Sequence, residues 1–167
     1  FVTGLLVLRR VPEAGGEGIP SYISAVDFEG GRMDRAATLL KFPATVLTLA
    51  CMGSGGTVGP LARIGGGLGG WMTGVLRLSP AESRGGDLRT GAVCGVAGAV
   101  SAIFHSPLGG ALFAAEILRR ESMRYTDLFS ALLSGSAAYG VYKLLLGGQP
   151  FFSFSPPSPA IEGSDVL

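Results

Sequence analysis

The chain has 167 residues with a formal net charge of +1, and only 15% of its residues are Asp, Glu, Lys or Arg, whereas soluble domains carry about a quarter. Mean hydropathy is +0.46. The sequence contains no basic stripe, which excludes a nucleic-acid-binding surface. The 28 glycines lie inside apolar segments, a pattern typical of helices packed closely in lipid and not of a soluble enzyme.

The first half of the chain contains three apolar segments. FVTGLLVLRR, at residues 1–10, ends in two arginines and predicts the tail of a helix whose start is missing, because a signal peptide carries its charges before the apolar stretch. Residues 36–53 predict a helix with a kink at Pro43 that neighbouring helices relieve. Residues 61–78, uncharged between Arg63 and Arg77, predict the next helix.

The second half contains a long uncharged stretch and one further helix. Residues 90–115 carry no charge but are interrupted by His105, Ser106 and Pro107, so we expect two shorter helices that meet at this break. Residues 127–147 predict the last helix. Several segments are at or below the ~20 residues that cross a hydrocarbon core, and short, broken helices are typical of channels and transporters.

These segments predict an all-α, polytopic membrane protein with broken and tilted helices. Residues 1–147 should be almost wholly helical, with breaks at 12–20, 53–60 and 104–107. No β-sheet is expected through residues 36–78. The loop-like end, PPSPAIEGSDVL, together with the missing start, predicts a piece of a longer protein.

Small residues recur at every fourth position within the helical segments. This spacing predicts a flat face that allows close helix packing. The residues are Gly66, Gly70 and Gly74 in one helix, Gly91, Gly95 and Ala99 in the next, and Ser136 and Gly140 in the last.

The distribution of arginines predicts a topology. Basic residues occupy three connections: Arg9 and Arg10, then Arg84 and Arg89, then the group Arg119, Arg120 and Arg124. Lys143 is the last Lys or Arg of the chain. By the positive-inside rule the three basic connections are cytoplasmic, and FFSFSPPSP is outside.

Three glycine- and proline-rich motifs stand where a loop turns into a helix. They are PEAGGEGIP at Pro12 to Pro20, GTVGPLARIGGGLG at Gly56 to Gly69, and FHSPLGGALFAAE at Phe104 to Glu116. Each presents unpaired backbone N–H groups at a helix start. Together with the positive end of the helix dipole, these groups form an anion site without a basic side chain. Partial charges of this kind bind an anion and also release it.

These motifs resemble those of the voltage-gated chloride channel (CLC) family. PEAGGEGIP is similar to that family's PEAGGSGIP, GTVGPLARIGG to its GREGPTVQIGG, and FHSPLGGALFAAE to its FNAPLAGILFIIE. The order and spacing also agree over nearly the whole chain. The resemblance implies a fold of two inverted half-repeats, of which residues 1–167 form a partial transmembrane domain, the first half only. It also implies a homodimer in a lipid bilayer, with one chloride pathway in each subunit.

The resemblance places the anion pathway on the starts of two helices and shows three departures from the family. The expected pathway residues are Gly16, Glu17, Gly18, Ile19, Pro20, Gly56, Val58, Gly59 and Pro60. Glu17 replaces a serine that faces the anion, Val58 stands at the gating glutamate, and Ile117 stands at the proton-relay glutamate. Glu17 either faces the pathway or is a loop residue without a role. The neighbouring Glu116 is expected to pair with Arg119 or Arg120.

The missing acids favour a passive anion channel without proton coupling, in a bacterial inner or plasma membrane. The alternatives are a proton-coupled exchanger of the same family, a non-conducting relative, and a soluble enzyme whose GSGGTVG or GGGLGG loop binds a nucleotide. The last needs a preceding strand and a GxGxxG or GxxxxGK[ST] pattern, which the sequence does not meet.

No catalytic constellation, metal site or cofactor is expected, so the protein is not predicted to be an enzyme. Cys51 and Cys94 lie in apolar segments far apart in sequence and are interpreted as buried, inert thiols. The lone histidine, His105, is expected to cap a helix or to pack at the helix break.

Overall fold

The computed structural model describes residues 15–16, 18–53, 55–76, 84–117 and 125–147, with the side chains of 84–86 excepted. All regular secondary structure in these ranges is helical, which confirms the predicted all-α class. The helices are α2 (Ile19–Asp27), α3 (Arg35–Ala50), α4 (Val58–Leu76), α5 (Arg84–Phe104), α6 (Pro107–Glu116) and α7 (Tyr125–Leu146). The predicted helix tail at residues 1–10 lies outside the described residues.

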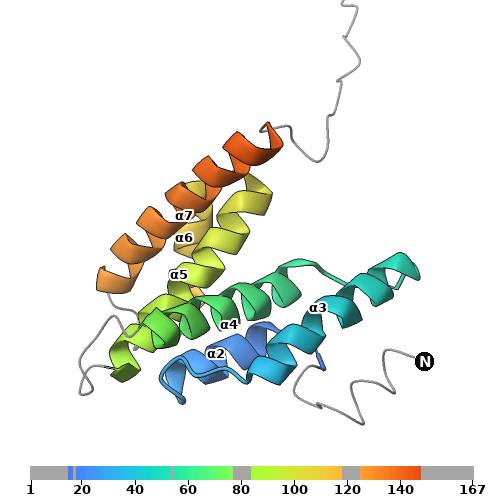
Figure 1. Ribbon diagram of the computed structural model, residues 1–167, viewed down its shortest axis with the longest axis horizontal. Coiled ribbons are helices and arrows are strands. Elements are labelled where there is room, and N and C mark those ends of the chain that lie inside the picture. Colours follow the sequence, from blue (N-terminus) through green and yellow to red (C-terminus); the bar gives the residue numbers. More distant parts are fainter. Residues whose placement is uncertain (1–14, 17, 54, 77–83, 118–124, 148–167) are drawn as a thin grey trace, which may run out of the picture.

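The helices form two groups that meet along α4 and α5 (Figure 1). In one group α5, α6 and α7 all contact one another, and in the other α2 and α3 pack against α4. The most extensive contact in the fold is between α4 and α5. Helix α4 therefore links the two groups, and its start is positioned by α2 on one side and by the α5–α7 group on the other.

Glycines allow the backbones of α4 and α5 to touch. A Cβ added to Gly65 would lie 2.6 Å from the carbonyl oxygen of Gly95, and one added to Gly69 would overlap the carbonyl oxygen of Gly91. Gly91 and Gly95 were predicted to form a packing face, and they do. On α4 the glycines that face α5 are Gly65 and Gly69, one position before the predicted Gly66 and Gly70.

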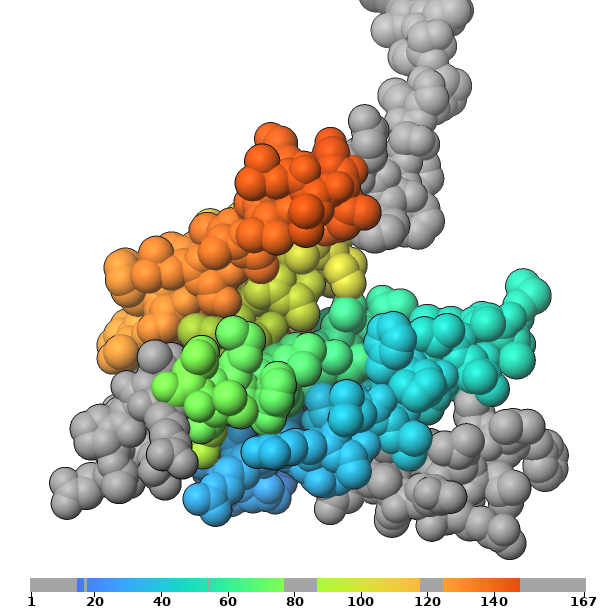
Figure 2. Space-filling view, in the orientation of Figure 1, coloured from blue at the N-terminus to red at the C-terminus, as the bar shows by residue number. Residues whose placement is uncertain are grey.

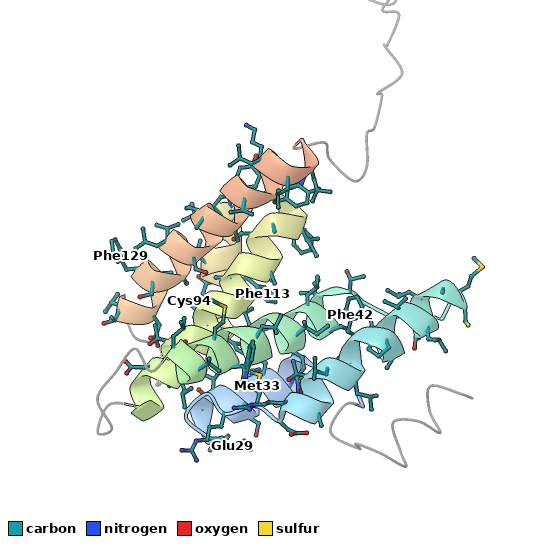
Figure 3. All side chains as sticks on the ribbon, in the orientation of Figure 1. Glu29, Met33, Phe42, Cys94, Phe113 and Phe129 are labelled. Carbon is teal, nitrogen blue, oxygen red and sulfur yellow. The ribbon has the colours of Figure 1, made fainter. Side chains whose placement is uncertain are left out.

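The predicted strip on α4 packs in another direction. A Cβ added to Gly66 would lie 3.0 Å from Met33 and 3.2 Å from Tyr22, on the side of α2; Figure 3 shows Met33 between α2 and α4. Since successive helical residues are ~100° apart, two adjacent columns of glycine serve two different neighbours. A single four-residue period in the sequence does not separate them.

The predicted strip on α7 does not pack inside the molecule. Ser136 is exposed, and a Cβ added to Gly140 would meet nothing within 4 Å. Instead Gly98 of α5 lies against Ala138 and Ser134 of α7, and the Ser134 hydroxyl donates to the carbonyl oxygen of Cys94 over 2.9 Å.

Small side chains fill the core, and one tyrosine spans it. Tyr22, which is fully buried, donates its hydroxyl to the carbonyl oxygen of Ala114 over 3.1 Å and so ties α2 to α6. The cluster around it consists mostly of valine and alanine from α4 to α7: Ala62, Ala92, Val93, Val96, Ala97, Val100, Ala111, Ala114 and Ala131, with Val26 of α2. Short side chains bring the helix axes close, as in bundles packed in lipid.

A buried ion pair joins the starts of α5 and α7. Arg89 Nε lies 3.2 Å from Asp127 Oδ2, and Thr90 donates its hydroxyl to Asp127 Oδ1 over 2.8 Å. The two helices therefore start at the same end of the group. This agrees with the prediction that the basic connections before α5 and before α7 lie on one side of a membrane; which side that is stays a prediction.

The helix boundaries confirm most of the segment predictions. Helix α3 continues through Pro43, α5 and α6 meet at the predicted break, and α7 matches its segment. Helix α4 begins at Val58, so the predicted break at 53–60 was too long; Pro60 fits the first turn, where its missing N–H is not needed. Helix α2 was predicted only through its start, at the PEAGGEGIP motif, because its nine residues include several polar side chains and do not form an apolar run.

The cysteine prediction was wrong for one residue. Cys51 follows the end of α3 and is exposed, whereas Cys94 of α5 is half-buried. The space-filling view shows this end of α3 projecting from the rest of the described residues (Figure 2). An apolar segment alone does not indicate which of its residues the fold covers.

Two of the described helices have the length and composition of membrane spans. They are residues 87–104 of α5, 39% of which is buried inside the molecule, and α7, of which only 11% is buried. Apolar side chains of α7 point away from the group, as Phe129 does in Figure 3. Phe129 is 66% exposed and Leu144 86%. An outer face of this kind suits lipid or another apolar surface.

Candidate functional site

The starts of α2 and α4 lie against each other. Gly18, the N-cap of α2, has φ 102° and no side-chain cap hydrogen bond. A Cβ added to Gly18 would lie 2.5 Å from the carbonyl oxygen of Gly59 and 3.3 Å from Cβ of Arg63. Both the left-handed backbone and this close approach require glycine. Two helix N-termini therefore converge at one place, the α2–α4 junction.

Backbone groups contribute partial positive charge at the junction. Neither helix has an acidic residue in its first turn. The first N–H groups of a helix have no partner within the helix, and the helix dipole adds about half a positive charge at each N-terminus. Backbone alone can therefore attract an anion here.

The structure brings together most of the predicted pathway residues. Gly18, Ile19 and Pro20 form the start of α2, and Val58, Gly59 and Pro60 form the start of α4. Gly59 and Pro60 are buried, and Val58 is half-buried. The remaining predicted residues are Gly16, which is exposed with φ 72°; Gly56, exposed in the loop before α4; and Glu17, which lies outside the described residues.

Two buried cations that the sequence reading did not place in the pathway lie beside the junction. Lys41 of α3 is 6% exposed and Arg63 of α4 is 4% exposed. Lys41 Nζ donates to the carbonyl oxygen of Gly16 over 2.5 Å, and Arg63 is close enough to Lys41 for their charges to repel. In the sequence, Lys41 could have been noticed as a lysine inside an apolar segment. Arg63 could have been noticed as an arginine where the family motif quoted above has glutamine.

Ile117 lies at the C-terminal end of α6. It is the residue that caps the C-terminus of α6, and it packs against the same core cluster that Ile19 borders. Glu116, one residue earlier, is exposed. Its predicted partners, Arg119 and Arg120, lie outside the described residues, so that pairing stays a prediction.

The third motif does not join the α2–α4 junction. The start of α6 is capped by Ser106, whose Oγ accepts from the Gly109 N–H over 3.2 Å. His105 has φ 54°, and its ring packs on Tyr139 and Tyr142 of α7 with centroid distances of 5.9 and 4.9 Å. The packing role expected for His105 is confirmed, while Ser106 is the cap.

Two further observations concern metal and nucleotide sites in the described residues. Within these ranges no cluster of His, Cys, Asp and Glu could hold a metal ion. The segment before the glycines at 53–56 is helix α3, whereas a nucleotide-binding loop of the kind considered above follows a strand.

The family model of the voltage gated chloride channel matches residues 1–164. The curated relatives include proteins named H(+)/Cl(-) exchange transporter ClcA from Salmonella arizonae, Salmonella newport and Salmonella paratyphi B. Each is 34% identical over 158 residues, which is 94% of this chain and 31% of the relative.

The chain thus spans about a third of the length of these relatives. No solved structure matches it. The match of the family model over residues 1–164 shows that this chain belongs to the voltage-gated chloride channel family.

Proposed function

We propose that the protein carries chloride or a similar small anion passively across a membrane, without coupling to protons. The family membership and the convergence of two helix N-termini support an anion pathway at the α2–α4 junction. We infer the absence of proton coupling from the side chain at the start of α4, which is Val58.

Proton coupling needs a side chain that binds and releases a proton and that competes with the anion when charged. Val58 has no titratable group, and its β-branched side chain is stiff at χ1. Ile117 offers no proton site at the other position, and a neighbour such as Glu116 points ~100° away around a helix. Both ends of a proton route would therefore lack their carrier.

The second candidate is proton-coupled exchange, which the names of the curated relatives favour. In that case an acid elsewhere would replace the two missing ones, and Glu17 is the first to suspect. A non-conducting relative is the third. The proposal also includes a homodimer, voltage gating and a multi-pass location in a bacterial inner or plasma membrane, all of which follow from the family and not from the contacts described here.

The test uses the full-length protein that carries this chain, reconstituted in liposomes with an imposed chloride gradient while external pH is recorded. We expect downhill chloride flux that changes little with pH and no sustained proton movement. Uphill proton movement that stops when chloride is held at equilibrium would contradict the proposal. Absence of chloride flux from protein shown to be folded would favour the non-conducting relative.

A matched variant makes the test sharper. Val58→Glu places a carboxyl at the start of α4, and the charged carboxylate should compete with the anion. Chloride flux should therefore fall as pH rises through the pKa of that carboxyl, and should recover as pH is lowered. Val58→Gln, of the same size but without a titrating group, should stay insensitive to pH.

A further inference from the structure

One side chain of α2 reaches from the α2–α4 junction to a helix on the far side of the core. Tyr22 is fully buried and lies one helical turn after Gly18, to whose carbonyl oxygen its N–H donates over 3.0 Å. Its hydroxyl donates to the carbonyl oxygen of Ala114 on α6 over 3.1 Å. The backbones of α2 and α6 are not close neighbours, so this side chain makes a direct link between the junction and α6.

The hydroxyl of Tyr22 binds a helix end. A helix leaves its last four carbonyl oxygens without an N–H partner inside the helix, and Ala114 lies in the last turn of α6. Ala114 is buried, so the hydroxyl takes the place that water takes at an exposed helix end. This hydrogen bond anchors the Tyr22 side chain to α6.

The ring of Tyr22 packs into a space that a glycine leaves on α4. A Cβ added to Gly66 would lie 3.2 Å from Cδ2 of Tyr22, so the ring lies directly against the backbone of α4. Gly66 follows Gly59, which meets Gly18, by about two helical turns. Helix α2 thus contacts α4 at two points. The third contact, on α6, opposes rotation of α2 about Gly18.

We infer that Tyr22 is a positioning residue that determines the size selectivity of the anion pathway, because it sets the spacing between the N-termini of α2 and α4. This inference rests on the proposed function and adds to it that the pathway discriminates between chloride and a larger monovalent anion such as iodide. An anion gains full stabilisation only where N–H groups of both helices reach it. Binding groups must be held within ~0.5 Å to make such a distinction.

The experiment measures chloride and iodide flux in liposomes that contain the full-length protein, and the Kd of each anion by titration calorimetry. Tyr22→Phe keeps the ring over Gly66 and removes the hydroxyl. We expect the ratio of iodide to chloride flux to rise about twofold to tenfold, the factor by which one net hydrogen bond biases an equilibrium between two spacings. Tyr22→Leu removes the ring as well and should shift the ratio at least as far.

Two control variants separate positioning from stability. Ser134→Ala also removes a hydroxyl that donates to a backbone carbonyl of another helix, that of Cys94, but Ser134 lies on α7, which packs on α5 and α6. It should lower stability and leave the iodide-to-chloride ratio unchanged. Tyr125→Phe removes a tyrosine hydroxyl at a position that is 88% exposed, and it should change neither quantity. A loss of folded protein alone scales the flux of both anions equally.

The outcomes separate the inference from the proposed function. Flux of both anions with an unchanged ratio in folded Tyr22→Phe and Tyr22→Leu would overturn the inference and leave transport standing. The same shift in Ser134→Ala would also overturn it, because the cause would then be general loosening.

If the parent carries no anion, transport is contradicted and the two Kd values decide. A change in the ratio of iodide to chloride Kd in Tyr22→Phe would still support the role of Tyr22, whereas an unchanged ratio or no binding would overturn it. Thermal unfolding in detergent identifies the variants that fold. If Tyr22→Phe does not fold, Gly66→Ala tests the same contact, because it keeps the hydroxyl but presses on the ring, and it should shift the same ratio.

Discussion

Buried cations occur in two regions of this molecule, and their surroundings differ. At the start of α5, Arg89 lies 3.2 Å from Asp127, which also accepts from Thr90. At the α2–α4 junction, Lys41 donates to a neutral backbone carbonyl and stands beside a second cation, Arg63. In the first region a protein carboxylate balances the charge, and the result is a structural link between two helices. In the second region the two cations come from different helices, and Lys41 holds the loop before α2 through its hydrogen bond to Gly16.

The largest expected effect is on the balanced region. Asp127→Asn would leave the Arg89 guanidinium buried without its counter-charge, which costs about 3 kcal/mol or more of unfolding free energy. We expect a large drop in thermal stability in detergent. Replacing both partners, Arg89→Met with Asp127→Leu, should restore most of the loss. A single variant as stable as the parent would show that the link contributes little.

The next effect compares two glycines of the junction loop. Gly18→Ala should cost about 2–3 kcal/mol of stability, because a left-handed backbone costs ~1–2 kcal/mol without glycine and the new Cβ would meet Gly59 at 2.5 Å. Gly16→Ala has a positive φ as well but nothing within 4 Å, so it should cost only ~1 kcal/mol. Chemical or thermal unfolding of both variants measures the difference, and equal losses would mean that contact with Gly59 is unimportant.

A smaller effect concerns Glu17, the acidic residue between Gly16 and Gly18. If Glu17 faces the pathway, Glu17→Ser removes a like charge from a poorly screened site and should raise chloride affinity or flux by roughly threefold to tenfold. Chloride binding and liposome flux both report it. No change in either would assign Glu17 to the loop surface.

The smallest effect is expected on α7. Gly140 is in the helix interior, and its added Cβ would meet nothing, so Gly140→Ala should stabilise the helix by about 0.5–1 kcal/mol. The same change at Gly95, where Cβ would overlap the Gly65 carbonyl, should destabilise the protein. Thermal unfolding of the pair tests the assignment. A loss of stability at Gly140 would indicate that α7 packs there against another copy of the protein.

Sequence alone was sufficient for the helices and for the two helix starts of the site. Apolar runs and the break at His105 to Pro107 located α3 and α5 to α7, and the glycine–proline motifs placed Gly18 and Val58 at helix N-termini. Only the start of the short helix α2 was predicted, because its residues form no apolar run; it packs through contacts such as that of Tyr22 with Ala114. Those contacts are distant in sequence.

The proximity of Lys41 and Arg63 could not have been predicted from sequence in the same way. Lys41 and Arg63 are 22 positions apart on different helices, and each alone resembles a residue that ends or interrupts an apolar segment. Their meeting depends on how α3 crosses α4, which no local pattern specifies. The glycine column of α4 that packs on α5 was likewise not evident from sequence, because both glycine columns have the same period.

The contact between α4 and α5 limits which substitutions natural variants of the protein can tolerate. Gly65, Gly69, Gly91 and Gly95 meet backbone to backbone, with the small side chains of Thr73 and Ala99 beside them, so little can repack around a change. Every missense substitution at these positions adds a Cβ, and not even alanine is conservative. Natural variants that alter any of them should be purged, while exposed apolar positions on α7 can drift among residues of similar hydropathy. A lineage that did replace one of these glycines would need a second change on the facing helix to keep α4 packed against α5.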